Sequence, residues 1–101
     1  MKDKELLELA AKAAGITYKY YSDPEGLIIN DDQWPLVVWN PLTDDGDALR
    51  LAVKLHFAIS WTVCFVQVAY TQEEYMEGED AAPATRRAVV LAAATVGKET
   101  K

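Results

Sequence analysis

Residues 58–70 have the sequence AISWTVCFVQVAY, which is the strongest strand signal in the chain and the stretch on which the expected fold depends. It contains no charged residue. Strand alternation places Ile59, Trp61, Val63 and Phe65 on one face and Cys64, Val66, Val68 and Tyr70 on the other. Apolar residues on both faces favour a central strand that is covered from both sides. Because the stretch is long for a single strand, we also expect a bend or a bulge within it.

Two helices are predicted near the ends of the chain. Residues 2–14 have apolar residues at helical spacing, and Gly15 follows them where a residue in the left-handed conformation would end the helix. Residues 84–96 are rich in alanine and valine, with Pro83 suited to the first helical position and Gly97 expected to end the helix. We expect helices on both faces of the sheet to bury the two-sided strand.

A third helix is predicted to begin after Asn40-Pro41, with Thr43 as its N-cap. Three aspartates occupy its first turn, where the helix dipole favours negative charge: Asp44, Asp45 and Asp47. The expected buried stripe consists of Leu49, Ala52, Val53 and His56. Carboxylates also bind hard cations, but the sequence does not have the spacing of an EF-hand loop, because the twelfth position from Asp44 or Asp45 is Leu55 or His56 and not glutamate. We therefore favour helix capping over a metal site.

Three short strands are predicted between the first two helices, at residues 16–21, 27–30 and 34–39, with a turn at residues 23–26. Residues 72–80 are predicted to form an acidic loop. The expected order of elements is α-β-β-β-α-β-α. The expected fold class is α/β in the broad sense (α+β), with a small, mainly antiparallel sheet sandwiched by helices.

The composition is that of an ordinary globular protein, and we expect residues 1–101 to form a single domain. A folded monomer of 11.2 kDa exposes about 5,700 Å² to solvent. The net charge of −6 argues against nucleic acid as a partner, because phosphate binding needs a positive surface. The single Cys64 excludes an internal disulfide and a cysteine-based zinc site. No apolar run has the length of a membrane span, so no membrane association is expected.

Arg86 and Arg87 stand at the start of the predicted C-terminal helix, where positive charge opposes the helix dipole. Because this placement goes against the helix-dipole preference, we expect the two arginine side chains to have a partner. We favour an internal ion pair with the aspartates of the preceding helix or with acidic residues just upstream. The alternative is a bound anion, because a guanidinium presents a bidentate fork to carboxylate or phosphate. His56, the only histidine, is expected to cap a helix end, and no catalytic residue, metal or cofactor is expected.

The aromatic residues are too numerous to be buried completely in a chain of this size. They include Trp34, Trp39, Trp61, Tyr18, Tyr20 and Tyr21. Trp39, Tyr18 and Tyr20 are therefore candidates for a binding surface, although ordinary sheet cover is the favoured interpretation. The acidic segment adds Glu73, Glu74 and Glu77 as candidate contacts. It is either a solvated connector or a surface that recognises a basic partner.

Two blocks of sequence are distinctive, WNPLTDDGDALRLAVKL at residues 39–55 and ATRRAVV at residues 84–90. Together with the opening helix at residues 6–16, they resemble segments of small uncharacterised accessory proteins of tailed bacteriophages and prophages. The predicted arrangement is similar to the phage α-β-α sandwich domain. The resemblance implies a phage-encoded protein in the cytoplasm of a bacterial host. It also implies that the three aspartates face the two arginines across a common sheet.

We expect a non-enzymatic protein that binds a host bacterial protein and inhibits a defence or regulatory complex. The alternative is a small-ligand binder that sequesters a nucleotide signal at Arg86 and Arg87, with Trp39 stacking nearby. This alternative predicts a concave pocket that joins an arginine to an aromatic ring. An enzyme that uses His56 and the aspartates is the third hypothesis. A homodimer is also expected, because the two-sided strand and the alanine-rich helix would complete their burial against a second copy.

Overall fold

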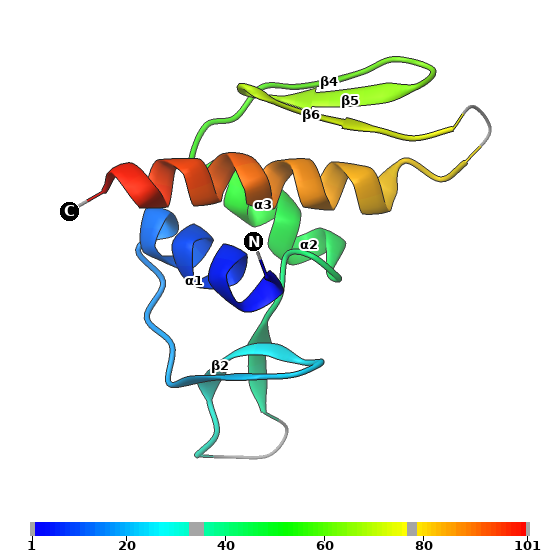
Figure 1. Ribbon diagram of the computed structural model, residues 1–101. Helices are drawn as coiled ribbons and strands as arrows, with labels where there is room; N and C mark the ends of the chain where they lie inside the picture. Colours follow the sequence, from blue (N-terminus) through cyan, green and yellow to red (C-terminus); the bar gives the residue numbers. More distant parts are fainter. Residues whose placement is uncertain (1, 33–35, 77–78, 101) are drawn as a thin grey trace.

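The computed structural model describes residues 2–32, 36–76 and 79–100, and these form three helices and two three-stranded antiparallel sheets (Figure 1). The helices are α1 (Asp3–Ala14), α2 (Asp45–Lys54) and α3 (Ala82–Glu99). The first sheet contains β1 (Tyr20–Ser22), β2 (Gly26–Asn30) and β3 (Val37–Trp39). The second contains β4 (Ile59–Trp61), β5 (Phe65–Val68) and β6 (Thr71–Glu74).

The elements are stacked in layers around α3. The β4–β5–β6 sheet lies on one side of this helix, and α1 and α2 lie on the other (Figure 1). The β1–β2–β3 sheet lies beyond α1 and α2, at the bottom of the view in Figure 1. The α+β class and the antiparallel pairing are confirmed. The layering differs from the prediction, because the helices lie at the centre and the two sheets lie outside them.

The predicted long strand at residues 58–70 is wrong, because the chain reverses at Thr62–Cys64 and forms the β4–β5 hairpin. The Thr62 hydroxyl accepts hydrogen bonds from the backbone N–H groups of Cys64 and Phe65, at 3.3 and 3.1 Å. These bonds hold the reversal in place. A tight turn stabilised by one threonine side chain therefore replaces the expected bend.

The reversal also explains the apolar residues on both expected faces. In the register of the hairpin, Ile59 pairs with Val68 and Trp61 pairs with Val66. Residues that pair across antiparallel strands point to the same side of the sheet. All four side chains therefore lie on the face toward α3, where Val66 and Val68 are fully buried. The other face is mainly polar, so the sheet is covered by helix on one side only.

Three further predictions about the strands need correction. Residues 72–74 of the predicted acidic loop belong to β6, which pairs with β5. The strand predicted at 16–21 forms only at Tyr20–Ser22. The strand predicted at 34–39 forms at Val37–Trp39, whereas residues 33–35, and with them Trp34, lie outside the described residues. The turn at Asp23–Glu25 and the strand that follows it agree with the prediction.

The helix α2 begins one residue later than predicted and buries a different face. Its N-cap is Asp44, not Thr43, and the Asp44 side chain accepts a hydrogen bond from the backbone N–H of Asp47 at 2.8 Å. The buried residues are Asp47, Ala48, Leu51 and Ala52. Leu49 and Val53, which were expected inside, are 62% and 63% exposed. The rotation follows from Asp47, whose carboxylate turns inward and accepts a hydrogen bond from the buried backbone N–H of Asn40 at 2.9 Å.

Two expected helix ends also differ. The helix α2 ends at Lys54, and His56 lies beyond it as an exposed residue with a positive φ of 58°. The helix α3 does not end at Gly97 but continues to Glu99. The predicted end of α1 is confirmed, because Gly15 stands at its C-terminus in the left-handed conformation with φ 71°.

Gly97 has a packing role, because the backbones of α1 and α3 meet at this position. A Cβ atom on Gly97 would lie 2.0 Å from the carbonyl oxygen of Leu9. Small residues surround this contact and are almost completely buried, among them Ala10, Ala11, Ala14, Ala93 and Ala94. Small side chains allow two helices to approach more closely than the usual 8–10 Å between axes. The core of the protein is built on this close α1–α3 contact.

Replacement of Gly97 by alanine tests the close contact. The new methyl group would force α1 and α3 apart, and overpacking of this kind costs about 1–3 kcal/mol or more. We expect Gly97→Ala to lower the free energy of unfolding by at least about 2 kcal/mol, although alanine is the better helix former by about 1 kcal/mol. The measurement is urea denaturation followed by circular dichroism.

Gly46→Ala in α2 is the matched control, because the atoms nearest to a Cβ there belong to the side chains of Arg50 and Asp44, at 3.2 Å. The Arg50 side chain is largely exposed and can move, and the Asp44 carboxylate that caps α2 needs to shift by only a few tenths of an ångström. The free energy of unfolding of this variant should stay the same or rise by up to about 1 kcal/mol. If both variants lost the same free energy of unfolding, the loss in Gly97→Ala could not be attributed to the α1–α3 contact.

Candidate functional site

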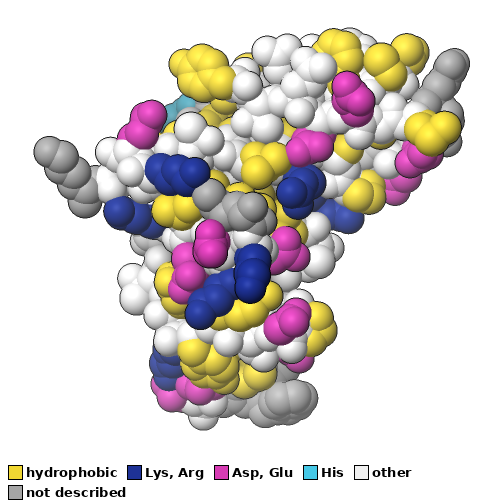
Figure 2. Space-filling model, viewed as in Figure 1, with side chains coloured by type: hydrophobic (Ala, Val, Ile, Leu, Met, Phe, Trp, Pro, Cys, Tyr) yellow, Lys and Arg dark blue, Asp and Glu magenta, His cyan; other side chains and the backbone are white. Residues whose placement is uncertain are grey.

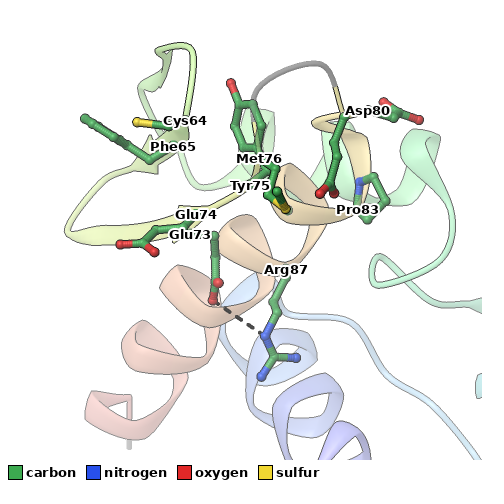
Figure 3. Close-up of a pocket in the computed structure, with 11 residues that line it drawn as sticks. Cys64, Phe65, Glu73, Glu74, Tyr75, Met76, Asp80, Pro83 and Arg87 are labelled. Atoms are coloured by element: carbon green, nitrogen blue, oxygen red, sulfur yellow. Dashed lines mark ion pairs between the residues drawn. The ribbon is translucent and has the colours of Figure 1, made fainter.

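The first hollow on the surface lies between the β5–β6 strands and the start of α3 and has a volume of about 690 Å³ (Figure 3). We call it the acidic hollow. Its lining residues are Cys64, Phe65, Glu73, Glu74, Tyr75, Met76, Glu79, Asp80, Pro83, Ala84 and Arg87. The lining therefore combines four carboxylates and one guanidinium with apolar and aromatic side chains. Two other hollows, one beside α2 and one beside α1, are lined by one and two carboxylates.

One ion pair forms within the acidic hollow. The Glu73 side chain points from β6 toward α3, and its Oε1 lies 3.5 Å from Nε of Arg87 (Figure 3). Glu74 is the next residue on the strand and points away from Arg87 (Figure 3). Asp80 accepts a hydrogen bond from the backbone N–H of Ala82 at 3.0 Å, which satisfies a donor at the start of α3. The carboxylates outnumber the single cation, so the hollow has a negative charge.

Aromatic side chains form the apolar part of the acidic hollow. Tyr75 is half-buried, and its hydroxyl donates a hydrogen bond to the carbonyl oxygen of Thr62 in the hairpin turn. Its backbone N–H donates to the carbonyl oxygen of Cys64 at 2.9 Å. Phe65 is half-buried and Met76 is exposed. Tyr75 is thus fixed at both ends, which holds an aromatic ring beside the carboxylates.

A second, apolar hollow of about 300 Å³ lies between α2, β4 and the start of α3. Its lining residues are Asp45, Ala48, Leu49, Ile59, Trp61, Ala81, Ala82, Thr85, Arg86 and Val89. Trp61 is held over α3 because its indole N–H donates to the Thr85 hydroxyl at 2.9 Å. The Thr85 hydroxyl in turn donates to the carbonyl oxygen of Ala81 at 2.8 Å. We call this the apolar hollow.

The two hollows lie on opposite sides of α3. Pro83, Ala84 and Arg87 face the acidic hollow, whereas Ala82, Thr85, Arg86 and Val89 face the apolar hollow. Each set has the spacing of one helix face, because residues three and four positions apart are neighbours on a helix. The adjacent residues Arg86 and Arg87 are separated by this geometry. They therefore have different partners.

Arg86 is the residue that confirms the predicted internal ion pair. Its Nη1 lies 2.6 Å from Oδ1 of Asp45, and its Nε donates to the carbonyl oxygen of Leu42 at 2.9 Å. The prediction is wrong for Asp44 and Asp47, which contact Arg50 of their own helix at 3.8 and 2.7 Å. Arg50 is the nearer cation, because it lies within two turns of both aspartates. Arg87 also forms an internal ion pair, but its partner is Glu73 of β6 and not one of the predicted acidic residues.

The predicted aromatic contacts lie outside both hollows. Trp39 is only 7% exposed and belongs to the core, so it has no ring face free to stack on a ligand. The Tyr18 hydroxyl donates to Glu8 at 2.9 Å, and burial together with this hydrogen bond raises the pKa of Tyr18. Tyr20 is partly exposed on β1, in the other sheet. Glu77 lies outside the described residues.

The structure brings together Glu73, Glu74, Asp80 and Arg87 with aromatic residues that were not singled out from the sequence. Phe65 was expected in the interior of a long strand. Tyr75 lies in the middle of the acidic segment at residues 72–80. An aromatic residue among carboxylates was the feature of the sequence that could have identified it as part of the site. On the face viewed in Figure 2, hydrophobic and acidic side chains lie together over the β4–β6 sheet. The Lys and Arg side chains of this face lie over the layers below it (Figure 2).

The described ranges contain no group of three His, Cys, Asp or Glu side chains placed to hold a metal ion. In the part of the chain that the structure covers, none of the helices has both the length and the apolar character needed to cross a membrane. Comparison with known proteins finds no family model, no curated protein and no solved structure that matches the chain. The resemblance to tailed-phage accessory proteins therefore stays a prediction from the sequence blocks.

The contacts of Arg86 lead to a test of its structural role. Arg86→Lys keeps the positive charge but removes the planar fork that reaches Asp45 and the Leu42 carbonyl together. We expect the free energy of unfolding to fall by about 1–2 kcal/mol, because a carbonyl loses its charged donor. Asp45→Asn is the comparison and should cost less than about 1 kcal/mol, since Asp45 is largely exposed. Chemical denaturation of both variants gives the two values, and an equal loss would contradict the assigned contacts.

Proposed function

We propose that this chain is a small, non-enzymatic binding protein that takes a basic segment of a protein partner in the acidic hollow. The proposal rests on one observation, the gathering of four carboxylates around a concave surface with two aromatic rings. Carboxylates pair with lysine and arginine, and aromatic faces attract the same cations. A hollow of about 690 Å³ has the size range of a binding site for a small ligand or a few side chains.

The carboxylates of the acidic hollow differ in availability. Glu73 is already paired with Arg87, and Asp80 accepts a hydrogen bond from the α3 backbone. Glu74 lines the hollow but points away from Arg87 and is exposed, and Glu79 is exposed in the segment before α3 (Figure 3). These two groups are therefore the main candidates for contacts with a partner's cations. The Glu73–Arg87 pair instead helps to join β6 to α3 and so shapes the hollow.

The proposal includes a bacterial host protein as the partner, as the resemblance to tailed-phage accessory proteins implies. A non-enzymatic protein that encloses a basic segment of its partner prevents the normal ligand of that segment from binding. Inhibition of a host defence or regulatory complex is the consequence that we propose for this mode of binding. Support for this part comes from the sequence blocks at 39–55 and 84–90 and from the negative hollow.

The alternative, a nucleotide-binding protein, has less support. A concave surface that joins an arginine to an aromatic ring does exist, with Trp61 in place of Trp39. However, Arg86 already contacts Asp45 and the Leu42 carbonyl, and the apolar hollow offers few other polar groups. Arg87 lies among carboxylates, which would repel a phosphate. Neither arginine is therefore placed to bind an anion.

The direct test measures binding of a short fluorescent peptide of alternating arginine and leucine by anisotropy. The wild-type protein should bind this peptide and should not bind a matched peptide with glutamate in place of arginine. Glu74→Gln combined with Glu79→Gln should weaken binding about fivefold, as expected for two exposed ion pairs of about 0.5 kcal/mol each. Added salt should weaken binding further, because the pairs are exposed.

Glu5→Gln combined with Glu99→Gln is the control, since it removes the same charge at two exposed helical positions outside the acidic hollow. Binding by this variant should equal that of the wild type.

A pull-down from bacterial lysate with the same three proteins then identifies the natural partner. A partner retained equally by the wild type and the Glu74/Glu79 variant would contradict the assignment of the acidic hollow.

A further inference from the structure

The outer face of α2 is apolar at its centre, and none of the residues that the structure describes covers it. Leu49 and Val53 are one turn apart on this face and are 62% and 63% exposed. Trp61 of β4 is 55% exposed, and it lines the apolar hollow together with Leu49. Single exposed apolar side chains are common, but a contiguous group beside a hollow is typical of an interaction surface. We call these three residues the α2 patch.

The exposed area of the chain leaves room for an interface with a second copy. The chain exposes 6,418 Å². Folded monomers of this mass expose about 5,700 Å², so the excess is about 700 Å². One partner of a standard protein–protein interface buries about 800 Å². The excess is therefore of the same order as the area that one copy buries in a stable complex.

The charges of α2 fit a second copy of the same helix in antiparallel orientation. Asp44, Asp45 and Asp47 stand at its N-terminal end, where Arg50 and Arg86 pair with them and leave this end net negative, and Lys54 stands in its last turn. An antiparallel pair places each acidic end beside the basic end of the other helix. The two helix dipoles also oppose each other in this orientation, which is favourable. A parallel pair would place like charges together.

We propose that the protein forms a homodimer through the α2 patch, with the two α2 helices antiparallel across a two-fold axis. In such a self-complementary contact, Leu49 of each copy packs near Val53 of the other, and Trp61 covers the contact from β4. This surface differs from the one expected from the sequence, because the predicted two-sided strand is a hairpin. The acidic hollow lies on the opposite side of α3 and stays open. The dimer therefore presents two acidic hollows, and its formation does not depend on the proposed function.

The test is the mass of the purified protein by size-exclusion chromatography with light scattering, over a range of concentrations. A reducing agent is present so that the exposed Cys64 forms no disulfide. We expect a mass twice that of the 11.2 kDa chain. Leu49→Asp should weaken association at least about thirtyfold, because a charge at the centre of the interface removes an apolar anchor. Tyr70→Asp is the control, since Tyr70 is fully exposed in the β5–β6 turn, and it should leave the dimer intact.

A second pair of variants tests the antiparallel orientation. Lys54→Glu should weaken association about tenfold, because it places like charges together at both symmetric ends of the contact. Lys12→Glu is matched to it, since Lys12 is also an exposed lysine in the last turn of a helix. It should have no effect on association. Equal effects of the two variants would overturn the antiparallel orientation.

Circular dichroism checks that each variant is folded. Val53→Asp replaces Leu49→Asp as the test if the latter is unfolded. A wild-type mass of one chain at every concentration would overturn the dimer and leave the α2 patch to a different partner. An unchanged dimer in folded Leu49→Asp or Val53→Asp would also overturn the proposal. Neither result would bear on binding of the basic peptide, so failure of the dimer and failure of the proposed function are distinguishable.

Discussion

The close approach of α3 to α1 is the constraint on which the rest of the structure depends. At Gly97 the two helices meet with no room for a side chain, because a Cβ atom would overlap the Leu9 carbonyl. Buried alanines extend this contact on both helices. Small residues bury little apolar area each, so the helices gain stability through close packing along their length. The sheet of β4–β6 then covers the remaining side of α3 with Val66 and Val68.

The central position of α3 explains why two different surfaces form beside its first turns. One side of the helix meets β6 and the acidic residues that precede α3, and the other side meets α2 and β4. Neighbouring residues on a helix point in different directions, about 100° apart. Arg86 therefore helps to hold α2 in place through Asp45 and Leu42, whereas Arg87 helps to hold β6 through Glu73. A pair of adjacent arginines thus joins α3 to two separate elements.

The capping network at the start of α2 determines which residues face solvent. Asp44 caps the helix, and Asp47 accepts the buried N–H of Asn40 and contacts Arg50. A buried N–H without a partner costs about 1–3 kcal/mol, so Asp47 is held inside. With the helix fixed in this rotation, Leu49 and Val53 point outward. Local hydrogen bonding therefore overrides the apolar spacing that predicted the opposite face.

The sequence by itself determined the α+β class, the position of the three helices, the left-handed end of α1 at Gly15 and the excess of acidic residues. These features depend on local spacing, capping and composition. Only the tertiary structure decided that residues 58–70 reverse at Thr62, that Gly97 lies inside a helix, and that Tyr75 and Phe65 join the acidic residues. A long strand and a hairpin show the same alternation of side chains in the sequence, so the pattern does not reveal the turn. A glycine in a helical sequence predicts a helix end, whereas Gly97 is needed because another backbone lies against it. Contacts between distant segments supply this information, because they fix which side chains are buried.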